Sequence, residues 1–245
     1  MSSLPPLPPP FRPCGEHIAI ELDGARALFT TRRGGCSQGA YASLNLGRFT
    51  DDDPAAVEAN RELLERALGV RFLYGRQVHG ARVQRRTSAD DLLEEADGQA
   101  TALPGLAPLV LTADCLPVAI AGRGAVAMVH AGWRGLARGV IAEGVRAVRE
   151  LGASGPLSAA IGPGAGGCCY QVGDEVLEAF AHSGAVRDGR RLDLRALAAI
   201  QLRDLGVERV HDVGLCTICS DRTLFYSHRR DHGRTGRQAG IAWLS

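Results

Sequence analysis

The stretch TADCLPVAIAGRGAVAMVHAGWRG, residues 112–135, contains the pattern around which the rest of the chain is arranged. Two apolar runs, 116–121 and 125–129, are separated by a short Gly-Arg-Gly turn, which is typical of a β-hairpin. Cys115 precedes the first run and His130 follows the second. Pairing of the two strands through so short a turn is expected to bring this thiol and this imidazole together.

A second imidazole, His79, lies in the segment RQVHG. Two histidines and one cysteine form a suitable ligand set for zinc, and zinc sites that perform chemistry use three protein ligands and leave a fourth position for water or substrate. Taken singly, His79 and His130 could instead be hydrogen-bonded histidines and Cys115 a small buried apolar side chain. The position of all three beside Gly, Pro or Asp at expected strand ends favours the metal site, because strand interiors are needed for the core.

These segments also resemble a known family. RQVHG, TADCLP, VHAGWRG, the run IGPGAGGCCYQVGDEV and the C-terminal FYSHRRD and TGRQAGIAWL are similar to the YfiH-type laccase-domain family, whose members are variously named polyphenol oxidase, purine nucleoside phosphorylase and peptidoglycan editing factor. The resemblance runs from about residue 29 to residue 244. It implies that His79, Cys115 and His130 bind Zn²⁺. It also implies an α+β fold with mixed β-sheets covered by helices, in a four-layer α/β/β/α sandwich.

Length and composition restrict the other possibilities. The 245 residues suffice for one large domain or two small ones, and the absence of a repeat or of a linker after residue 13 predicts a single domain over 14–245. The sequence has no lysine, which excludes a lysine Schiff base. Its formal net charge of +1 gives no basic field that would favour nucleic acid or an anionic membrane. No feature indicates an obligate protein partner.

Cysteine usage and the N-terminus favour a cytoplasmic protein with reduced thiols. The seven cysteines are an odd number, and the first residues hold prolines where a secretory signal has a basic start and an apolar core. No apolar run approaches the ~20 residues needed to span a bilayer. Cys216 and Cys219 form a CxxC pair, a pattern found in zinc sites and redox dithiols. We favour neither, because the sequence has no second CxxC and no helix start follows the pair.

The N-terminal part begins with MSSLPPLPPPFRP, residues 1–13, expected to be a mobile tail because its prolines prevent a ladder or a helix. Ordered structure is expected from His17, with strands over 17–22 and 25–30 around the hairpin turn Asp23-Gly24. In the following loop SLNLG, Asn45 is suited either to an Asx turn or to a substrate contact.

The clearest helix begins with Asp53 as N-cap and Pro54 at the first helical position, and it ends at Gly69. Its apolar face is expected from Leu63, Leu64, Ala67 and Leu68. Arg61 lies on the same helix and is expected in solvent or beside the buried face.

Further elements follow from apolar runs and spacing. Runs 109–111, 118–120 and 126–129 are continuously apolar, as in strands covered on both faces. Two strand segments are expected around His79 within 73–83. Other helices are expected over 136–151, 173–181 and 194–205, and other strands over 158–161, 207–213 and 239–244. The glycine-rich loop 162–170 could present amides to an anion but carries no Walker or dinucleotide fingerprint.

The name polyphenol oxidase implies a copper site, and the sequence can be checked for the ligands that such a site needs. A multicopper oxidase needs many histidines, typically in His-x-His pairs, whereas this chain has seven histidines and no such pair. A blue-copper site would add an axial methionine to two histidines and a cysteine, and Met128 is better explained as a core residue. Cu²⁺ could still occupy the zinc ligands through its high affinity, and phenol oxidation could follow.

Two purine reactions fit the resemblance better, namely phosphorolysis and deamination. Zinc deaminases of the base-editing type have a glutamate two residues after the ligand histidine, where this chain has Ala81. Phosphorolysis requires an arginine that neutralises phosphate. The resemblance implies substrate contacts from the asparagine of SLNLG and from an arginine of the following NR pair, which are Asn45 and Arg61. The cluster of Arg229, Arg230, Arg234 and Arg237 is suited to a phosphate or to a solvated loop.

A third reaction class uses the same side chains without metal. Cys115 as nucleophile and His130 as base would form a cysteine hydrolase, which would suit peptidoglycan precursor editing, and the family fold also resembles bacterial toxin deamidases with such a pair. A structural zinc or binding module is disfavoured by the three-ligand set.

The sequence departs from the family pattern at Gly166-Gly167, Gln171 and His228, which leaves the ligands intact and bears on substrate preference. We expect a zinc enzyme that phosphorolyses adenosine, inosine and methylthioadenosine, with adenosine deamination as a second activity.

Overall fold

The computed structural model describes residues 4–88, 93–180 and 187–245. Within these residues the chain forms two six-stranded mixed sheets and a two-stranded ribbon. The first sheet has the order β1 (Arg12–Cys14), β2 (His17–Leu22), β3 (Ala25–Phe29), β14 (Gln238–Leu244), β7 (Leu106–Thr112) and β4 (Arg71–Leu73). The second has the order β13 (Val207–Asp212), β10 (Ser154–Ile161), β8 (Leu116–Arg123), β9 (Ala125–Ala131), β6 (Gly98–Thr101) and β5 (Val83–Arg86). The ribbon pairs β11 (Arg187–Asp188) with β12 (Arg191–Leu192).

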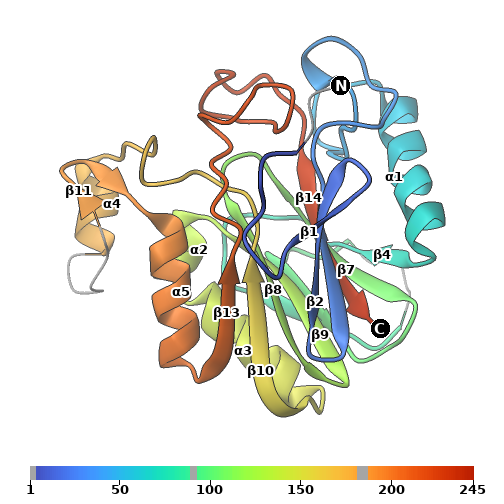
Figure 1. Cartoon of the computed structure of the whole chain (residues 1–245), viewed down its shortest axis with the longest axis vertical. Coiled ribbons are helices and arrows are strands. Elements are labelled where there is room, and N and C mark those ends of the chain that lie inside the picture. The colour runs from blue at the N-terminus through green and yellow to red at the C-terminus, as the bar shows by residue number, and fades with distance from the viewer. Residues whose placement is uncertain (1–3, 89–92, 181–186) are drawn as a thin grey trace.

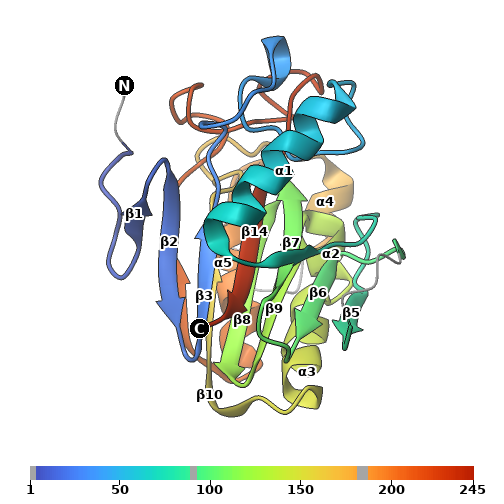
Figure 2. The same cartoon turned by 90° about the vertical axis from the view of Figure 1, so that its right-hand side faces the viewer.

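Helices cover the outer faces of both sheets. In the described part of the chain these are α1 (Pro54–Leu68), α2 (Trp133–Ala137), α3 (Val140–Glu150), α4 (Asp174–Ala179) and α5 (Leu194–Asp204), besides a 3-10 turn at Gly39–Tyr41. Figure 1 shows α1 on one side of the two sheets and α2, α3 and α5 on the other. Turned by 90°, Figure 2 shows α1 lying across the sheet that holds β7 and β14.

Three apolar clusters hold the layers together. One lies between the sheets and includes Ile20, Phe29 and Val126. A second lies between α1 and the first sheet, and a third lies between the second sheet and the helices α3 and α5. The architecture is therefore α+β in four layers, α/β/β/α, as predicted.

The central hairpin is also confirmed. β8 and β9 pair antiparallel with Pro117 opposite His130 and Gly122 opposite Ala125. Both strands are buried along almost their whole length, because each has the other sheet on one face and helices on the other. Helix α1 begins at Asp53, whose carboxylate accepts a hydrogen bond from the amide of Ala55, and ends at Gly69 with φ 67°, as its cap residues predict.

Several boundaries differ from the sequence-based prediction. The helix expected over 136–151 is two helices, because Gly139 adopts φ 84° and interrupts the helical backbone. The strands flanking His79 lie farther away than expected, at β4 and β5, so that 74–82 is a loop. Ala181, where the helix from 173 was expected to end, lies outside the described residues.

The N-terminal segment forms more structure than its prolines predicted. β1 pairs antiparallel with β2, with Arg12 opposite Ala19, and it lies at the edge of the sheet, where a proline costs least. Leu4, Leu7 and Phe11 pack on the cluster between the sheets, so a ladder and apolar contacts begin well before His17. Residues 1–3 lie outside the described part.

No helix among the described residues is long and apolar enough to cross a membrane.

Candidate metal centre

Three separate segments bring His79, Cys115 and His130 to one point. His79 lies in the loop between β4 and β5, Cys115 directly precedes β8, and His130 is near the end of β9. One ligand atom from each residue lies within 4.8 Å of the others. The imidazole centroids of His79 and His130 are 4.9 Å apart, with the rings inclined at 75°. The hairpin accounts for the meeting of Cys115 with His130, and the loop delivers His79.

The backbone around this group is strained at two residues. His79 has φ 57° and Asp114 has φ 93°, a region that residues with a Cβ rarely adopt. Gly132 faces the group, and a Cβ at that position would lie 2.8 Å from the sulfur of Cys115 and 3.3 Å from the ring of His79. Only glycine therefore fits at this position in the segment VHAGWRG.

Asp97 fixes the imidazole of His130 and the loop of His79 at the same time. One carboxylate oxygen lies 2.8 Å from Nδ1 of His130, and the carboxylate accepts hydrogen bonds from the amides of Val78, His79 and Gly80. Burial alone would raise the pKa of Asp97, but these hydrogen bonds lower it. The ionised carboxylate can only accept, so Nδ1 of His130 carries the proton and Nε2 is left to bind a metal. This pairing is the usual support of a zinc-binding histidine.

The thiol and the imidazole polarise each other. Burial would raise the pKa of Cys115, but the neighbouring His130 and His79 lower it to about 6. Burial would lower the pKa of His130, but Cys115 and Asp97 raise it to about 9. The structure thus favours the thiolate of Cys115, which is the form that binds zinc. The donor set, the orientation of His130 and the space left by Gly132 all fit one zinc ion with three protein ligands.

Asp114, the residue before Cys115, is held in its strained conformation by hydrogen bonds from two other loops. Its carboxylate accepts hydrogen bonds from the hydroxyl of Thr217, at 2.6 Å, and from the amide of Arg229, at 2.7 Å. Its backbone oxygen accepts a further bond from the amide of Ala165, at 2.7 Å. Cys115 is therefore positioned by contacts from two distant loops.

A pocket of about 410 Å³ opens onto His79, Cys115 and His130. Its wall contains arginines from four parts of the chain, together with aromatic side chains. The arginines are Arg48, Arg61, Arg134, Arg229 and Arg237, and the aromatic residues are Phe49, Tyr74, Trp133 and Tyr170. Burial, followed by the charge of Cys115, raises the pKa of Tyr170 to about 12, so its phenol stays neutral. The pocket can thus offer cations to an anion and flat apolar surfaces to a ring.

Asn45 is fully buried, and its side-chain amide forms hydrogen bonds with other residues of the protein. Its side-chain oxygen accepts hydrogen bonds from the amides of Gly47 and Arg237, and its side-chain nitrogen donates to Thr50 and Asp52. The bond from Gly47 is the Asx turn that was one of the two sequence-based explanations. The structure places Asn45 behind the wall of the pocket, where it fixes the backbone of Arg237.

Arg61 lines the pocket, but its setting differs from the expected solvated arginine. The residue is only 4% exposed, and its guanidinium donates to the backbone oxygen of Leu46 and lies 4.3 Å from the ring centroid of Tyr74. Leu63, expected on the apolar face of α1, is instead 45% exposed. The buried face follows Val57, Asn60, Arg61 and Leu64, because polar side chains on α1 bind the backbone of the loop 43–47.

The C-terminal arginine cluster divides between two tasks. Arg229 and Arg237 line the pocket. Arg230 pairs with Asp231 and donates to the backbone oxygens of Thr217 and Phe225, and Arg234 is exposed. Met128 is buried between the sheets, as the core explanation predicts.

Sequence reasoning missed Asp97, Tyr170 and Trp133. The only signal for Asp97 is its place directly before Gly98, in a segment with no chemical motif. Tyr170 and Trp133 lie inside the family-like motifs CCYQVG and HAGWRG, yet a single aromatic residue in a glycine-rich segment predicts a turn as readily as a pocket wall.

The sequence and the fold were also compared with known proteins. The model of the family described as multi-copper polyphenol oxidoreductase laccase matches residues 26–245. A purine nucleoside phosphorylase of Pseudomonas aeruginosa is 44% identical over 232 residues, covering 89% of this chain and 93% of the relative. The purine nucleoside phosphorylase YfiH of Escherichia coli is 38% identical, covering 90% and 94%.

A crystal structure of the hypothetical protein YfiH of Bacillus licheniformis has a TM-score of 0.88 and 32% identity, covering 97% of this chain and 100% of that one. A Neisseria meningitidis protein has a TM-score of 0.82 and 38% identity, covering 91% and 95%. The matched residues 26–245 contain His79, Cys115, His130 and every residue that lines the pocket, and the chain belongs to the YfiH-type laccase-domain family.

Proposed function

We propose that this protein is a zinc-dependent purine nucleoside phosphorylase acting on adenosine, inosine and methylthioadenosine. The observation that carries the proposal is the opening of the group His79, Cys115 and His130 onto a pocket of about 410 Å³ lined with arginines and aromatic rings. Its relatives named purine nucleoside phosphorylase support the same activity. The free thiols of the chain suit a reducing cytoplasm.

In the proposed reaction an oxygen of phosphate forms a bond to C1′ of the ribose while the bond from C1′ to the purine nitrogen breaks. The purine takes the bonding electrons and the proton that hydrogen phosphate gives up. Arg229 and Arg237 can neutralise the phosphate as forked donors, and Tyr170 can offer a ring face to the purine. A bound zinc ion would supply a Lewis acid for an oxygen or nitrogen of the substrates. Asp97 keeps His130 oriented throughout.

Adenosine deamination is proposed as a second activity of the same pocket. Water would add at C6 and ammonia would leave. Ala81 stands where base-editing deaminases have their glutamate, so the proton has to pass through another group. We therefore expect deamination to be the slower reaction.

Product analysis tests both activities. Purified protein is incubated with adenosine, with and without phosphate, and the products are separated by chromatography. Adenine and ribose 1-phosphate are expected only with phosphate. Inosine is expected without phosphate, and inosine together with its phosphorolysis product hypoxanthine is expected with it. Replacing His79, Cys115 or His130 by alanine should abolish adenine release. Undiminished turnover in all three variants would contradict the proposal.

A cysteine hydrolase is the second candidate, and one observation favours it. Asp97, His130 and Cys115 form a chain in which the thiol pKa is lowered and the imidazole pKa is raised, as in cysteine nucleophiles. Metal removal separates the two functions. A chelator should abolish phosphorolysis and zinc should restore it, whereas a cysteine hydrolase would gain activity on chelation and lose it to zinc.

A further inference from the structure

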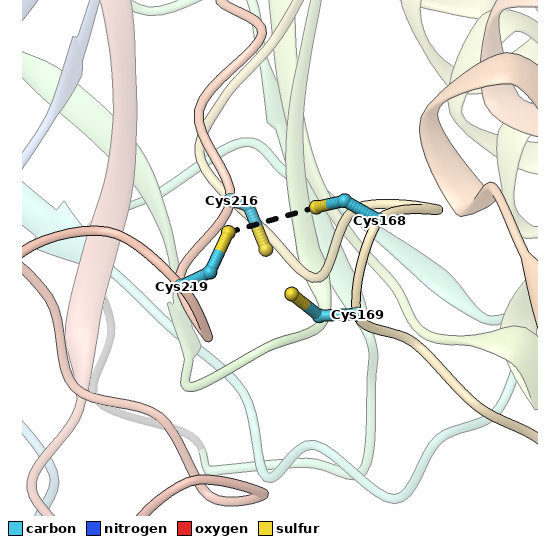
Figure 3. A group of neighbouring side chains, drawn as sticks. All are labelled: Cys168, Cys169, Cys216 and Cys219. Atoms are coloured by element: carbon cyan, nitrogen blue, oxygen red, sulfur yellow. Dashed lines mark hydrogen bonds between the residues drawn. The ribbon is translucent and has the colours of Figure 1, made fainter.

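A second group of possible metal ligands lies outside the pocket. The sulfur atoms of Cys168, Cys169, Cys216 and Cys219 all lie within 4.8 Å of one another. Figure 3 shows the four side chains pointing toward a common centre from two loops. We propose that these four cysteines bind a second zinc ion, and that this ion is structural and fastens one wall of the substrate pocket.

The fold explains why two cysteine pairs far apart in sequence meet. β10 and β13 are parallel neighbours, with Ile161 opposite Asp212, so the loops after them leave the sheet at the same edge. The loops remain paired beyond the sheet: the amide of Gly164 donates to the oxygen of Leu215, and the amide of Thr217 donates to the oxygen of Gly164. The adjacent pair Cys168 and Cys169 therefore supplies the second half-site that no CxxC pattern indicates.

The sulfur separations suit a single ion. Zinc–sulfur bonds of about 2.3 Å in a tetrahedron place sulfur atoms about 3.8 Å apart. The sulfurs of Cys168 and Cys219 are 3.6 Å apart, close to this value and far beyond the ~2.05 Å of a disulfide. An iron–sulfur cluster of two or four irons would place the cysteine sulfurs bound to different irons farther apart than the 4.8 Å that spans this group. Four sulfur ligands and no open position are characteristic of structural zinc.

The glycine-rich loop wraps around these sulfurs. The amide of Gly166 donates to the sulfur of Cys216 at 3.3 Å. A Cβ at Gly166 would lie 3.2 Å from the sulfur of Cys168 and 3.3 Å from Cβ of Cys216, so the loop approaches as closely as glycine allows. Amides that point at cysteine sulfur stabilise the thiolate required by a metal. The sequence suggested that amides of this loop could face an anion, and the proposed anion is the thiolate of Cys216.

The cluster is joined to the pocket through its flanking residues. Tyr170, which follows Cys169, lines the pocket, and the guanidinium of Arg229 lies 5.2 Å from its ring centroid. Thr217, which follows Cys216, donates to Asp114, the residue before Cys115. An ion that fixes the two loops therefore fixes Tyr170 and Asp114. This inference does not depend on the proposed phosphorolysis.

Metal content provides the test, by mass spectrometry of protein dialysed after loading with Zn²⁺ under reducing conditions. The wild-type protein is expected to retain two zinc ions per chain, the Cys115→Ala variant one, the Cys219→Ser variant one and the double variant none. Cys219 is exposed, so serine fits in its place. The Cys14→Ser variant is the matched control, since Cys14 is exposed and outside both groups, and it should retain two ions.

A spectroscopic measurement covers the case in which Cys219→Ser fails to fold. Co²⁺ loaded into the Cys115→Ala variant should show tetrahedral bands and strong sulfur-to-metal charge transfer, because four thiolates surround the ion. Wild-type protein that binds one ion, which Cys115→Ala removes, would overturn the proposal. So would a Cys219→Ser variant with unchanged zinc content, or wild-type protein whose mass under non-reducing conditions shows disulfides among these four cysteines.

Discussion

Two groups of side chains that could each hold a metal ion lie on neighbouring parts of this molecule, and they differ in the number of ligands and in their access to the pocket. His79, Cys115 and His130 offer three possible ligand atoms at a pocket, whereas Cys168, Cys169, Cys216 and Cys219 (the four-cysteine cluster) offer four from two loops. In the first group the carboxylate of Asp97 forms a hydrogen bond with Nδ1 of His130. In the second group the backbone amide of Gly166 donates a hydrogen bond to the sulfur of Cys216. A missing ligand leaves room for a substrate, and a complete shell leaves none.

Backbone conformation makes the same distinction. His79 and Asp114 adopt positive φ at the three-ligand group. In the four-cysteine cluster the close approach is made by Gly166, which does not have a positive φ, so the contact requires the missing Cβ and not a strained backbone. Strain at residues with side chains is typical of active sites, where the surrounding contacts must hold it.

The largest predicted effect comes from the three-ligand group. Cys115→Ala should lower kcat/KM for adenosine phosphorolysis at least about 1,000-fold, because several kcal/mol of Lewis-acid stabilisation are lost. Thermal unfolding should remain cooperative, which steady-state kinetics and calorimetry together would verify. Retention of more than a tenth of the activity would show that this thiol is not a ligand required for turnover.

A smaller loss of zinc affinity or activity is expected when Asp97, which contacts His130 and not the ion, is replaced. Asp97→Asn should lower zinc affinity or kcat about 10- to 100-fold, because the amide orients the imidazole of His130 less firmly. Zinc competition with a chromophoric chelator measures the affinity. Asn45→Ala is a useful comparison, since its hydrogen bonds position Arg237 rather than a ligand. It should therefore raise KM for phosphate and leave zinc affinity as it is. Equal zinc affinity and equal kcat in Asp97→Asn and wild type would contradict the role of Asp97 in orienting His130.

The metal-free protein gives a pH test of the same group. The pKa of Cys115 is lowered to about 6, so the thiolate is present above that pH and lost below it. Alkylation of Cys115 by iodoacetamide should be about tenfold faster at pH 7 than at pH 5. The Cys115→Ala variant supplies the background rate, and zinc should suppress the reaction. A rate that rises only above pH 8 would mean that His130 and His79 do not activate the thiol.

The smallest effect on catalysis is expected from the four-cysteine cluster. Cys219→Ser should lower kcat/KM only about two- to fivefold at 25 °C, because the ion positions Tyr170 and Asp114 without touching the substrate. It should also lower the Tm, because loss of a bound ion destabilises the native state. Cys115→Ala should show the reverse, a large loss of activity with a smaller change in Tm. A Cys219→Ser protein that melts like the wild type would remove the contrast between the two groups.

Most of the correct predictions about fold and site came from patterns among residues close together in the sequence. The central hairpin and the caps of α1 follow from neighbours in sequence, and the meeting of Cys115 with His130 follows from the hairpin. The four-cysteine cluster could not be foreseen in this way. It depends on β10 and β13 being parallel neighbours across a connection of more than forty residues, which no local pattern encodes. The sequence left the burial of Arg61 open for a related reason, since this burial depends on a backbone oxygen of a distant loop.

X-ray absorption at the zinc edge tests the central claim most directly, on the Cys219→Ser variant loaded with zinc so that only the three-ligand group is occupied. We predict one sulfur at about 2.3 Å, two nitrogens at about 2.0–2.1 Å and one further light atom that changes when phosphate and adenosine are added. A shell of several sulfurs, or a spectrum unchanged by Cys115→Ala, would contradict the account.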